Sequence, residues 1–349
     1  MAKRPVVKAV GVTAPQNSLL QTEARQFAAE IFAGKMKNLE KLLDVFENSA
    51  IESRHFAKEL EWYTKEHSFP EANAAFLQEA EILAEEACRQ ALLKSGLREE
   101  DIGMIIYVTS TGIATPSLEV KLIQKLGLPL NIRRLPIWGL GCAGGVAGLA
   151  RARELCKILD GKAVLVVAVE LCSLTFQLGD TSKANLIAVS LFADGAAAAV
   201  VAWENEGLSL LNSYSSLFPD TEDIMGWDLV DTGFKVRFSR DIPALVRGHL
   251  PLLVLEATAC WGIDFEKIRH YIVHPGGAKV LEAYADSLSL GCGKLYNACR
   301  VLNNYGNMSS VTVLFVLERF LAATPRSEDL GLMLALGPGF SAEQLLFEW

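Results

Sequence analysis

Three residues of this sequence combine reactive side chains with neighbours that suit nucleophilic acyl chemistry: Cys142, His274 and Asn307. Cys142 ends the glycine turn GLGC, and the amphipathic run AGGVAGLARARELC follows at once. Because unpaired N–H groups at a helix start favour a thiolate, we predict a lowered thiol pKa. His274 opens the turn HPGG after a strand-like run, and Asn307 follows a glycine in NNYGNMSS. Such a trio indicates acyl transfer.

Each of these residues also has an ordinary structural interpretation. Cys142 alone fits a small buried hydrophobic residue, and His274 alone fits a structural histidine. Asn307 alone fits a helix cap, the commoner use of asparagine beside a helix. The acyl-transfer hypothesis therefore depends on the three occurring together.

Alternating strand and helix patterns must position these residues, and they predict a layered α/β fold. The runs VLVVAVE and AAAAVVAW are too apolar for a sheet with one wet face, so helices should cover both faces. We expect buried strands at Met104–Ser110, Ala163–Cys172, Gly195–Trp203, Ile268–His274 and Gly331–Leu336, and helices at Glu71–Ser95, Gly145–Leu159 and Ser309–Ala322.

The two halves of the chain show a weak internal similarity in the order of their predicted elements. Each half runs from a strand through a glycine turn and a helix to a second strand, and Cys142 and Asn307 occupy corresponding places. We therefore divide the chain into residues 1–205, which carry the cysteine, and residues 206–349, which carry the histidine and the asparagine. The charged and aromatic segment 49–70 is interpreted as an excursion of the chain between two helices, with a solvated surface loop as the alternative.

Composition fits a well-buried enzyme and excludes other classes. The 349 residues are 51% hydrophobic, and the formal net charge of −8 argues against a nucleic-acid partner. No stretch reaches the roughly 18 uncharged apolar residues of a membrane span, and no signal peptide follows Lys3 and Arg4. The seven cysteines form no CxxC pair, so reduced thiols and a cytoplasmic location are expected.

The motifs GLGCAGG, SLFADGAAA, HPGG, NNYGNMSS and ALGPGF occur in the order and spacing of the type III polyketide synthases. The chain thus resembles this chalcone-synthase-like branch of the thiolase superfamily over nearly its whole length. WGLGCAGGVAGLARA with ELCSLTFQ is most similar to bacterial alkylpyrone synthases. The resemblance implies a five-layered αβαβα fold built from two similar halves, with the active site between them.

The resemblance also implies a role for each of the three residues. Cys142 would attack the thioester of a starter acyl-CoA, with His274 as an imidazolium partner that keeps the thiol ionised. Malonyl-CoA would then lose its carboxylate, and His274 and Asn307 would donate hydrogen bonds to the enolate oxygen. No metal or redox cofactor is expected.

Further positions follow from the same resemblance. Phe192 matches a gatekeeping phenylalanine, with a core aromatic as the alternative, and Val236 falls where plant relatives carry a second gate phenylalanine. Smaller residues at the gate and wall favour a long apolar starter, since each buried methylene contributes about 0.8 kcal/mol. The predicted wall residues are Cys172, Thr175 and Ser309.

The coenzyme entrance departs from the family pattern. Of the basic residues that line it in plant relatives, Lys41 is retained, whereas Asp44 and Asn48 occupy the other places. Arg54 is the candidate that would compensate for them.

Other functions remain open at this point. A ketoacyl synthase of the fatty-acid initiation type uses the same three residue types, but usually with a different sequence around the histidine and asparagine. A hydroxymethylglutaryl-CoA-synthase-like enzyme needs a glutamate base for which no clear candidate is present. A papain-like hydrolase carries its cysteine near the mature N-terminus. A non-catalytic acyl-binding protein on the same fold leaves the trio unexplained.

We therefore expect a homodimer that loads a fatty acyl-CoA on Cys142, extends it with malonyl-CoA and releases alkylpyrones. Alkylresorcinols are the product of the alternative ring closure. An acyl carrier protein is an alternative starter donor, because the chemistry at sulfur is the same.

Overall fold

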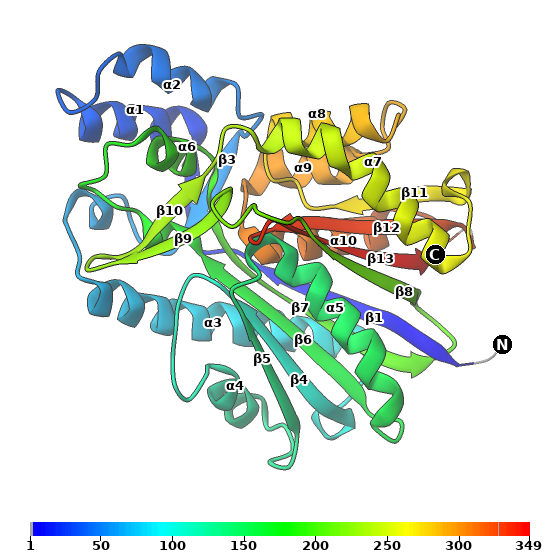
Figure 1. Ribbon diagram of the computed structural model, residues 1–349. Coiled ribbons are helices and arrows are strands. Elements are labelled where there is room, and N and C mark those ends of the chain that lie inside the picture. Colours follow the sequence, from blue (N-terminus) through cyan, green and yellow to red (C-terminus); the bar gives the residue numbers. More distant parts are fainter. Residues whose placement is uncertain (1–2, 327) are drawn as a thin grey trace.

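Nine strands form one mixed sheet within residues 3–326 and 328–349, the part of the chain that this computed structural model describes (Figure 1). The strand order is β11-β12-β13-β8-β1-β7-β6-β4-β5, and the pairs β4–β5, β4–β6 and β11–β12 are parallel. The bounds are β1 (Arg4–Thr13), β4 (Ile102–Thr109), β5 (Arg133–Trp138), β6 (Ala163–Leu171), β7 (Asp194–Glu204), β8 (Leu208–Leu217), β11 (Ile268–Val273), β12 (Leu330–Gly337) and β13 (Ser341–Glu348).

The sheet consists of two halves that meet where β1 pairs with β8. Among the described strands, β1 and β8 are paired at only two positions, Val6 with Ser209 and Val7 with Leu208. The division proposed from the sequence falls in the turn between β7 and β8.

Helices lie outside and between the two half-sheets. One outer face is covered by α3 (Phe69–Ser95) and α4 (Glu119–Leu126), and the other by α7 (Ile242–Trp261) and α8 (Ala278–Ser287). Between the halves lie α5 (Gly144–Leu155) and α10 (Thr312–Ala323), which contact strands on both sides (Figure 1). The layers confirm the predicted five-layered α/β fold, although the two half-sheets are continuous.

The side-chain alternation along β6 shows why both faces are apolar. Val164 and Val166 belong to the core shared with the central helices, whereas Leu165 and Val167 belong to the core beneath α3. Every residue of β6 is buried. The expectation that helices cover both faces of this sheet is therefore confirmed.

The long helix α3 begins and ends where its sequence directs. Ser68 and Glu71 form a reciprocal capping box at its start, and Gly96 closes it with a φ of 71°. The five predicted strands and three predicted helices match the structure to within a few residues at their ends. The helix predicted to reach residue 159 ends at Leu155 and continues as a 3₁₀ turn, Cys156–Ile158.

The weak internal similarity between the two halves of the sequence has a structural counterpart. The 3₁₀ turn Gly141–Ala143 precedes α5, and the 3₁₀ turn Ser309–Val311 precedes α10. Both helices have 12 residues and occupy the central layer. Cys142 and Asn307 thus lie near the starts of two equivalent helices.

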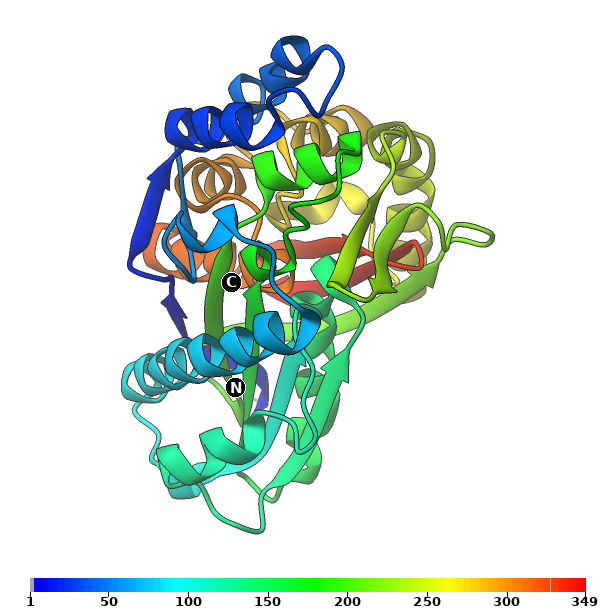
Figure 2. The same ribbon diagram turned by 90° about the vertical axis from the view of Figure 1, so that its left-hand side faces the viewer.

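A further group of elements covers one end of the molecule, on the side that faces the viewer in Figure 2. It comprises two helices that pack on each other and on a third, and two small antiparallel sheets of two strands each. Their bounds are α1 (Gln21–Phe32), α2 (Leu39–Glu47), α6 (Lys183–Leu191), β2 (Asn17–Leu20), β3 (Ser53–Phe56), β9 (Met225–Val230) and β10 (Gly233–Phe238). The remaining helix, α9 (Tyr296–Tyr305), packs against α10.

Segment 49–70 lies between α2 and α3, as the first interpretation expects. It contains β3, which pairs with β2, and it buries Arg54, Ala57 and Tyr63. The solvated-loop alternative is wrong for these residues because the partners that bury them are distant in sequence.

Among the described helices, α7 alone is long and apolar enough to cross a membrane by length and composition, with a mean hydropathy of 1.2. It carries Arg247, Glu256 and an internal Pro251. Val246 and Val254 are buried in the core of the second half. Such a helix is weak evidence for a membrane span, because covering helices of globular domains pass the same test.

Candidate active site

Cys142 lies in the tight turn before α5 and is 7% exposed. Gly141 adopts a φ of 47°, and its N–H donates to the Ser110 hydroxyl at 2.9 Å. A Cβ on Gly145 would stand 2.3 Å from the Ser310 carbonyl oxygen. The glycines are therefore required for the close approach of the two central helices around the sulfur.

Asn307 is fixed by four hydrogen bonds. Its backbone N–H donates to Leu191 O and its carbonyl accepts from the Ala193 N–H, both at 2.9 Å. Its side-chain oxygen accepts from the Ser309 N–H at 2.8 Å, and Nδ2 donates to Gly276 O at 3.1 Å. The orientation of the amide is thus determined, and one N–H of the amide remains for another acceptor.

His274 follows the end of β11, where its N–H donates to Leu334 O at 2.8 Å. The side chain is 2% exposed, and neither ring nitrogen has a hydrogen-bond partner in the described structure. Since Gly276 O binds the Asn307 amide, the HPGG turn and Asn307 meet directly. The side chains of Ser309 and Asn307 also lie close enough to the Cys142 sulfur to favour its charged form. The structure thus links the turn that follows His274 to Asn307, and Asn307 to Cys142, and all three side chains are buried.

The electrostatics of this site differ from the sequence prediction. Burial raises the pKa of the Cys142 thiol to about 12, although hydrogen bonds from Ser309 and Asn307 oppose this. Burial also lowers the pKa of His274 to about 3. The predicted lowering of the thiol pKa at a helix start is therefore outweighed by desolvation. Each group alone favours its neutral form, so a charge here requires proton transfer from the thiol to the imidazole, which yields an ion pair.

Glu170, at the end of β6, is a buried acidic residue that sequence reasoning missed. Its carboxylate accepts hydrogen bonds from the Ser110 N–H at 2.9 Å, the Thr111 hydroxyl at 2.8 Å and the Ser310 hydroxyl at 2.7 Å. Burial raises its pKa to about 6, and its charge contributes to the raised pKa of Cys142. An acidic residue ending the apolar run VLVVAVE was the available signal.

The raised pKa of Glu170 predicts a pH-dependent stability. The folded protein holds this proton up to about pH 6, whereas an ordinary glutamate loses it near 4.5. The contribution of Glu170 to the free energy of unfolding is therefore greatest below pH 4.5 and falls by about 2 kcal/mol as the pH rises through 6. In Glu170→Gln this part of the fall should vanish, since the amide can accept from the Ser110 N–H and donate to the Ser310 hydroxyl. Urea unfolding from pH 4 to 8, with exposed Glu256→Gln as a charge control, measures it. A wild-type pH dependence in Glu170→Gln would contradict the assignment.

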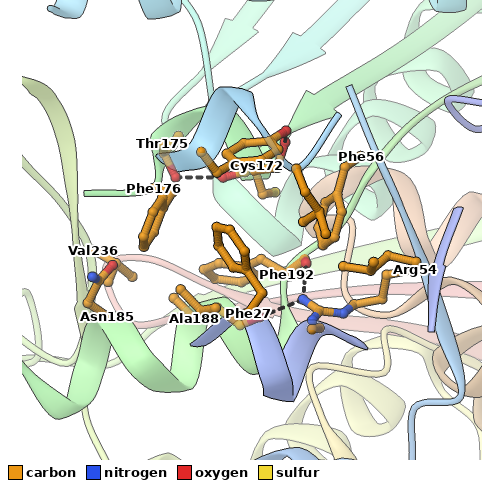
Figure 3. A pocket seen from close by; sticks show the side chains of 16 residues that line it. Phe27, Arg54, Phe56, Cys172, Thr175, Phe176, Asn185, Ala188, Phe192 and Val236 are labelled. Atoms are coloured by element: carbon orange, nitrogen blue, oxygen red, sulfur yellow. Dashed lines mark hydrogen bonds between the residues drawn. The ribbon is translucent and has the colours of Figure 1, made fainter. Parts of the chain in front are cut away.

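An apolar cavity of about 60 Å³ adjoins this site (Figure 3). Four residues predicted for the gate and wall line it: Cys172, Thr175, Phe192 and Val236. Rings from separate elements and the buried Arg54 also line it, namely Phe27, Arg54, Phe56, Tyr63 and Phe176. Ser309, also predicted for the wall, instead contacts the Cys142 sulfur. The volume holds only a few water molecules, so an acyl chain requires some of these rings to move.

Phe192 separates the cavity from the catalytic segment. Its side chain lines the cavity, while its backbone bridges Asn307. The ring also contacts Trp227 and Phe238 of the β9–β10 hairpin, at centroid distances of 6.2 and 6.4 Å. This position fits the predicted gate.

The predicted coenzyme entrance is corrected at one position. Arg54 is 1% exposed and donates hydrogen bonds to Gln21, Val189 and Phe192, so it cannot meet a phosphate at the surface. These partners lie 33 to 138 residues away along the chain, so no local pattern around Arg54 indicates them. Lys41 lies exposed on α2 and stays a prediction.

Comparison with known proteins now identifies the class to which this fold and site belong. The sequence profile for chalcone and stilbene synthases, N-terminal domain, matches residues 2–204, and the profile for the C-terminal domain matches residues 209–348. The chain belongs to this family. It is a type III polyketide synthase, and hence an acyltransferase.

Individual relatives cover nearly the whole chain. A putative chalcone synthase of Bacillus subtilis is 41% identical, with 98% of each chain aligned. The 1,3,6,8-tetrahydroxynaphthalene synthase of Streptomyces peucetius is 37% identical over 98% of this chain and 93% of the relative. The crystal structure of the corresponding synthase from Streptomyces coelicolor superimposes with a TM-score of 0.94 at 31% identity, with 99% of each chain covered.

Proposed function

We propose that Cys142 carries the growing chain, with His274 and Asn307 as the catalytic residues that stabilise negative charge on oxygen. The observation that carries this proposal is that the oriented amide of Asn307 acts on the buried thiol of Cys142 and also binds the turn of His274, whose buried imidazole has no hydrogen-bond partner. These groups are the nucleophile, base and oxyanion donors that acyl transfer requires.

The loading step begins with proton transfer from Cys142 to His274. The thiolate attacks the thioester carbon of an acyl-CoA, and the tetrahedral oxyanion collapses as the coenzyme sulfur leaves and takes a proton from the imidazolium. The products are an acyl-enzyme and free coenzyme A. Burial favours the neutral form of both Cys142 and His274, so the ion pair is short-lived. The imidazolium therefore gives up its proton, to the coenzyme sulfur, within the same step.

The extension step uses the two oxyanion donors. The bond between the malonyl methylene and its carboxylate breaks, CO₂ leaves, and the electron pair forms an enolate. Its oxygen accepts hydrogen bonds from His274 and Asn307. The enolate carbon then attacks the thioester on Cys142, and the sulfur leaves with its electron pair.

We propose fatty acyl-CoA as the starter and alkylpyrones as products, with alkylresorcinols as the alternative. The apolar rings around the cavity and the small Val236 side chain support an aliphatic chain. A further relative is named alpha-pyrone synthesis polyketide synthase-like Pks18, from Mycobacterium tuberculosis, at 27% identity over 98% of this chain.

A second candidate is a synthase that uses malonyl-CoA alone and forms an aromatic naphthalene product. The naphthalene synthases among the relatives favour it. The two candidates share every chemical step at Cys142 and differ in what the cavity accepts.

We also propose a homodimer located in the cytoplasm. Among the described strands β5 pairs only with β4, and Trp138 at the end of β5 is 51% exposed. An open strand edge next to an exposed aromatic side chain fits a subunit contact. The seven cysteines are all free thiols, which fits a reducing compartment. An acyl carrier protein stays an alternative starter donor.

The starter is tested by incubating the protein with malonyl-CoA and acyl-CoAs of increasing length, and by resolving the products by mass. We expect pyrones from long-chain starters. An aromatic product from malonyl-CoA alone would support the second candidate, and single-extension ketoacyl thioesters would contradict both.

In Val236→Phe we expect the preferred starter to shorten, because the added ring fills cavity volume. Each methylene that the cavity no longer holds lowers kcat/KM about fourfold, from its 0.8 kcal/mol. Leu229→Phe adds the same ring on the exposed face of the same hairpin and controls for the substitution. An unchanged length profile in Val236→Phe would show that this side chain does not bound the acyl site.

A further inference from the structure

The end of α6 is capped by side chains from distant segments. The last carbonyls of a helix have no partner within the helix, so other groups must satisfy them. Arg54 Nη1 donates to Val189 O and to Phe192 O, both at 2.7 Å. Gln21 Nε2 donates to Ser190 O at 2.8 Å, and Gln21 Oε1 accepts from Arg54 Nε at 3.0 Å. The Gln21–Arg54 pair therefore fixes the residue at which α6 ends and the position of the Phe192 backbone that follows it.

The same guanidinium side chain packs against the catalytic segment. A Cβ on Gly306 would stand 2.8 Å from Arg54 Cγ and Cδ, so the stem of the arginine lies directly on Gly306. The next residue, Asn307, is tied to Leu191 O and to the Ala193 N–H on either side of Phe192. Arg54 thus contacts both bridged segments: it donates to Phe192 O, as Figure 3 shows, and it packs on Gly306 beside the catalytic asparagine.

We propose that Arg54 is a positioning residue that sets the gate ring of Phe192 and the amide of Asn307 relative to Cys142. The proposal rests on the proposed role of Asn307 and extends it to Arg54, which lines the cavity but whose Nε and Nη1 donate to oxygens of the protein itself. Through Phe192, Arg54 determines which starters enter the cavity, and through Asn307 it determines how fast malonyl-CoA is decarboxylated. A displacement of about 1 Å at a catalytic group is enough to cost roughly 100-fold in rate.

The buried carboxylate of Asp194 favours the charged form of Arg54. Asp194 accepts hydrogen bonds from the Ala57 N–H at 2.7 Å and the Ser173 N–H at 2.8 Å, and its charge acts on the guanidinium. Burial lowers the pKa of Arg54 to about 9, while Asp194 opposes this, so the side chain stays charged at neutral pH. A positive charge alone is not sufficient at this position, because the planar guanidinium of Arg54 donates to three separate oxygen acceptors.

Lysine at position 54 tests the geometry while keeping the charge. A single ammonium cannot span Gln21 Oε1, Val189 O and Phe192 O together, since its donors radiate from one atom. The matched control is Arg153→Lys. Arg153 also donates to a backbone carbonyl, Leu211 O at 2.8 Å, but at the far end of α5.

Four measurements are made on wild type, Arg54→Lys and Arg153→Lys: acylation of Cys142 by intact mass, malonyl-CoA decarboxylation, starter-length profile and urea midpoint. We expect Arg54→Lys to acylate Cys142 fully and to keep the midpoint of the control. Its kcat for decarboxylation should fall roughly 10- to 100-fold at unchanged KM, with a broadened starter profile. Activity equal to that of Arg153→Lys, or lost only in proportion to unfolded protein, would overturn the proposal.

Gln21→Met decides the question if Arg54→Lys does not fold. This variant keeps the Arg54–Asp194 pair but removes the acceptor for Nε and the donor to Ser190 O. A smaller fall in decarboxylation with the same broadened profile supports the proposal, and wild-type behaviour overturns it. If decarboxylation is lost in an Asn307 variant but not in Arg54→Lys or Gln21→Met, the inference about Arg54 is wrong and the proposed role of Asn307 stands. Unchanged decarboxylation in the Asn307 variant would remove that role itself.

Discussion

Cys142→Ala is expected to lose acyl loading completely and to reduce polyketide formation by at least about 10³-fold, the scale seen when a catalytic nucleophile is removed. The alanine cannot form the thioester that holds the starter while malonyl units are added. Intact mass after mixing with an acyl-CoA measures loading, and product mass measures extension. Cys260→Ala changes an exposed cysteine on α7 and controls for loss of a thiol.

Decarboxylation of malonyl-CoA should survive in Cys142→Ala. The enolate needs the His274 and Asn307 donors but no bond to sulfur, so this variant separates the two halves of the mechanism. An acyl group still found on a cysteine of Cys142→Ala would assign the nucleophile elsewhere, with Cys172 in the adjoining cavity wall the first residue to examine.

The parts of this site that could be predicted are those with local causes. Cys142 and Asn307 stand beside glycines at helix starts, and the apolar run of β6 is a continuous sequence pattern, so a short window reveals each. The gate at Phe192 came from the family resemblance, and the structure places its ring in the cavity wall.

The parts that were missed depend on partners far apart in the sequence. Arg54 was assigned to the surface because its acceptors on α6 lie more than a hundred residues away. Glu170 is recognisable only once Ser110 and Ser310 are seen around it. The pKa of Cys142 was predicted from the helix start alone, whereas burial by both halves of the fold decides its direction.

Asn307→Asp is expected to lower malonyl-CoA decarboxylation and chain extension by roughly 10²–10³-fold, the cost of one oxyanion donor. The substitution keeps the shape of the side chain, and one carboxyl oxygen still accepts from the Ser309 N–H. The other oxygen then faces Gly276 O, where Nδ2 donates in the native protein. A carboxyl group satisfies that contact only by holding a proton, and it then has no donor left for the enolate.

The matched control is Asn303→Asp, because Asn303 Nδ2 also donates to a backbone carbonyl, Ala50 O, but outside the site. Steady-state release of CO₂ and intact mass of the acyl-enzyme separate the steps: Asn307→Asp should still be acylated at Cys142. Decarboxylation at the level of Asn303→Asp would mean that His274 alone stabilises the enolate. The fixed orientation of the Asn307 amide argues against that outcome, since four hydrogen bonds hold its free N–H beside the Cys142 sulfur.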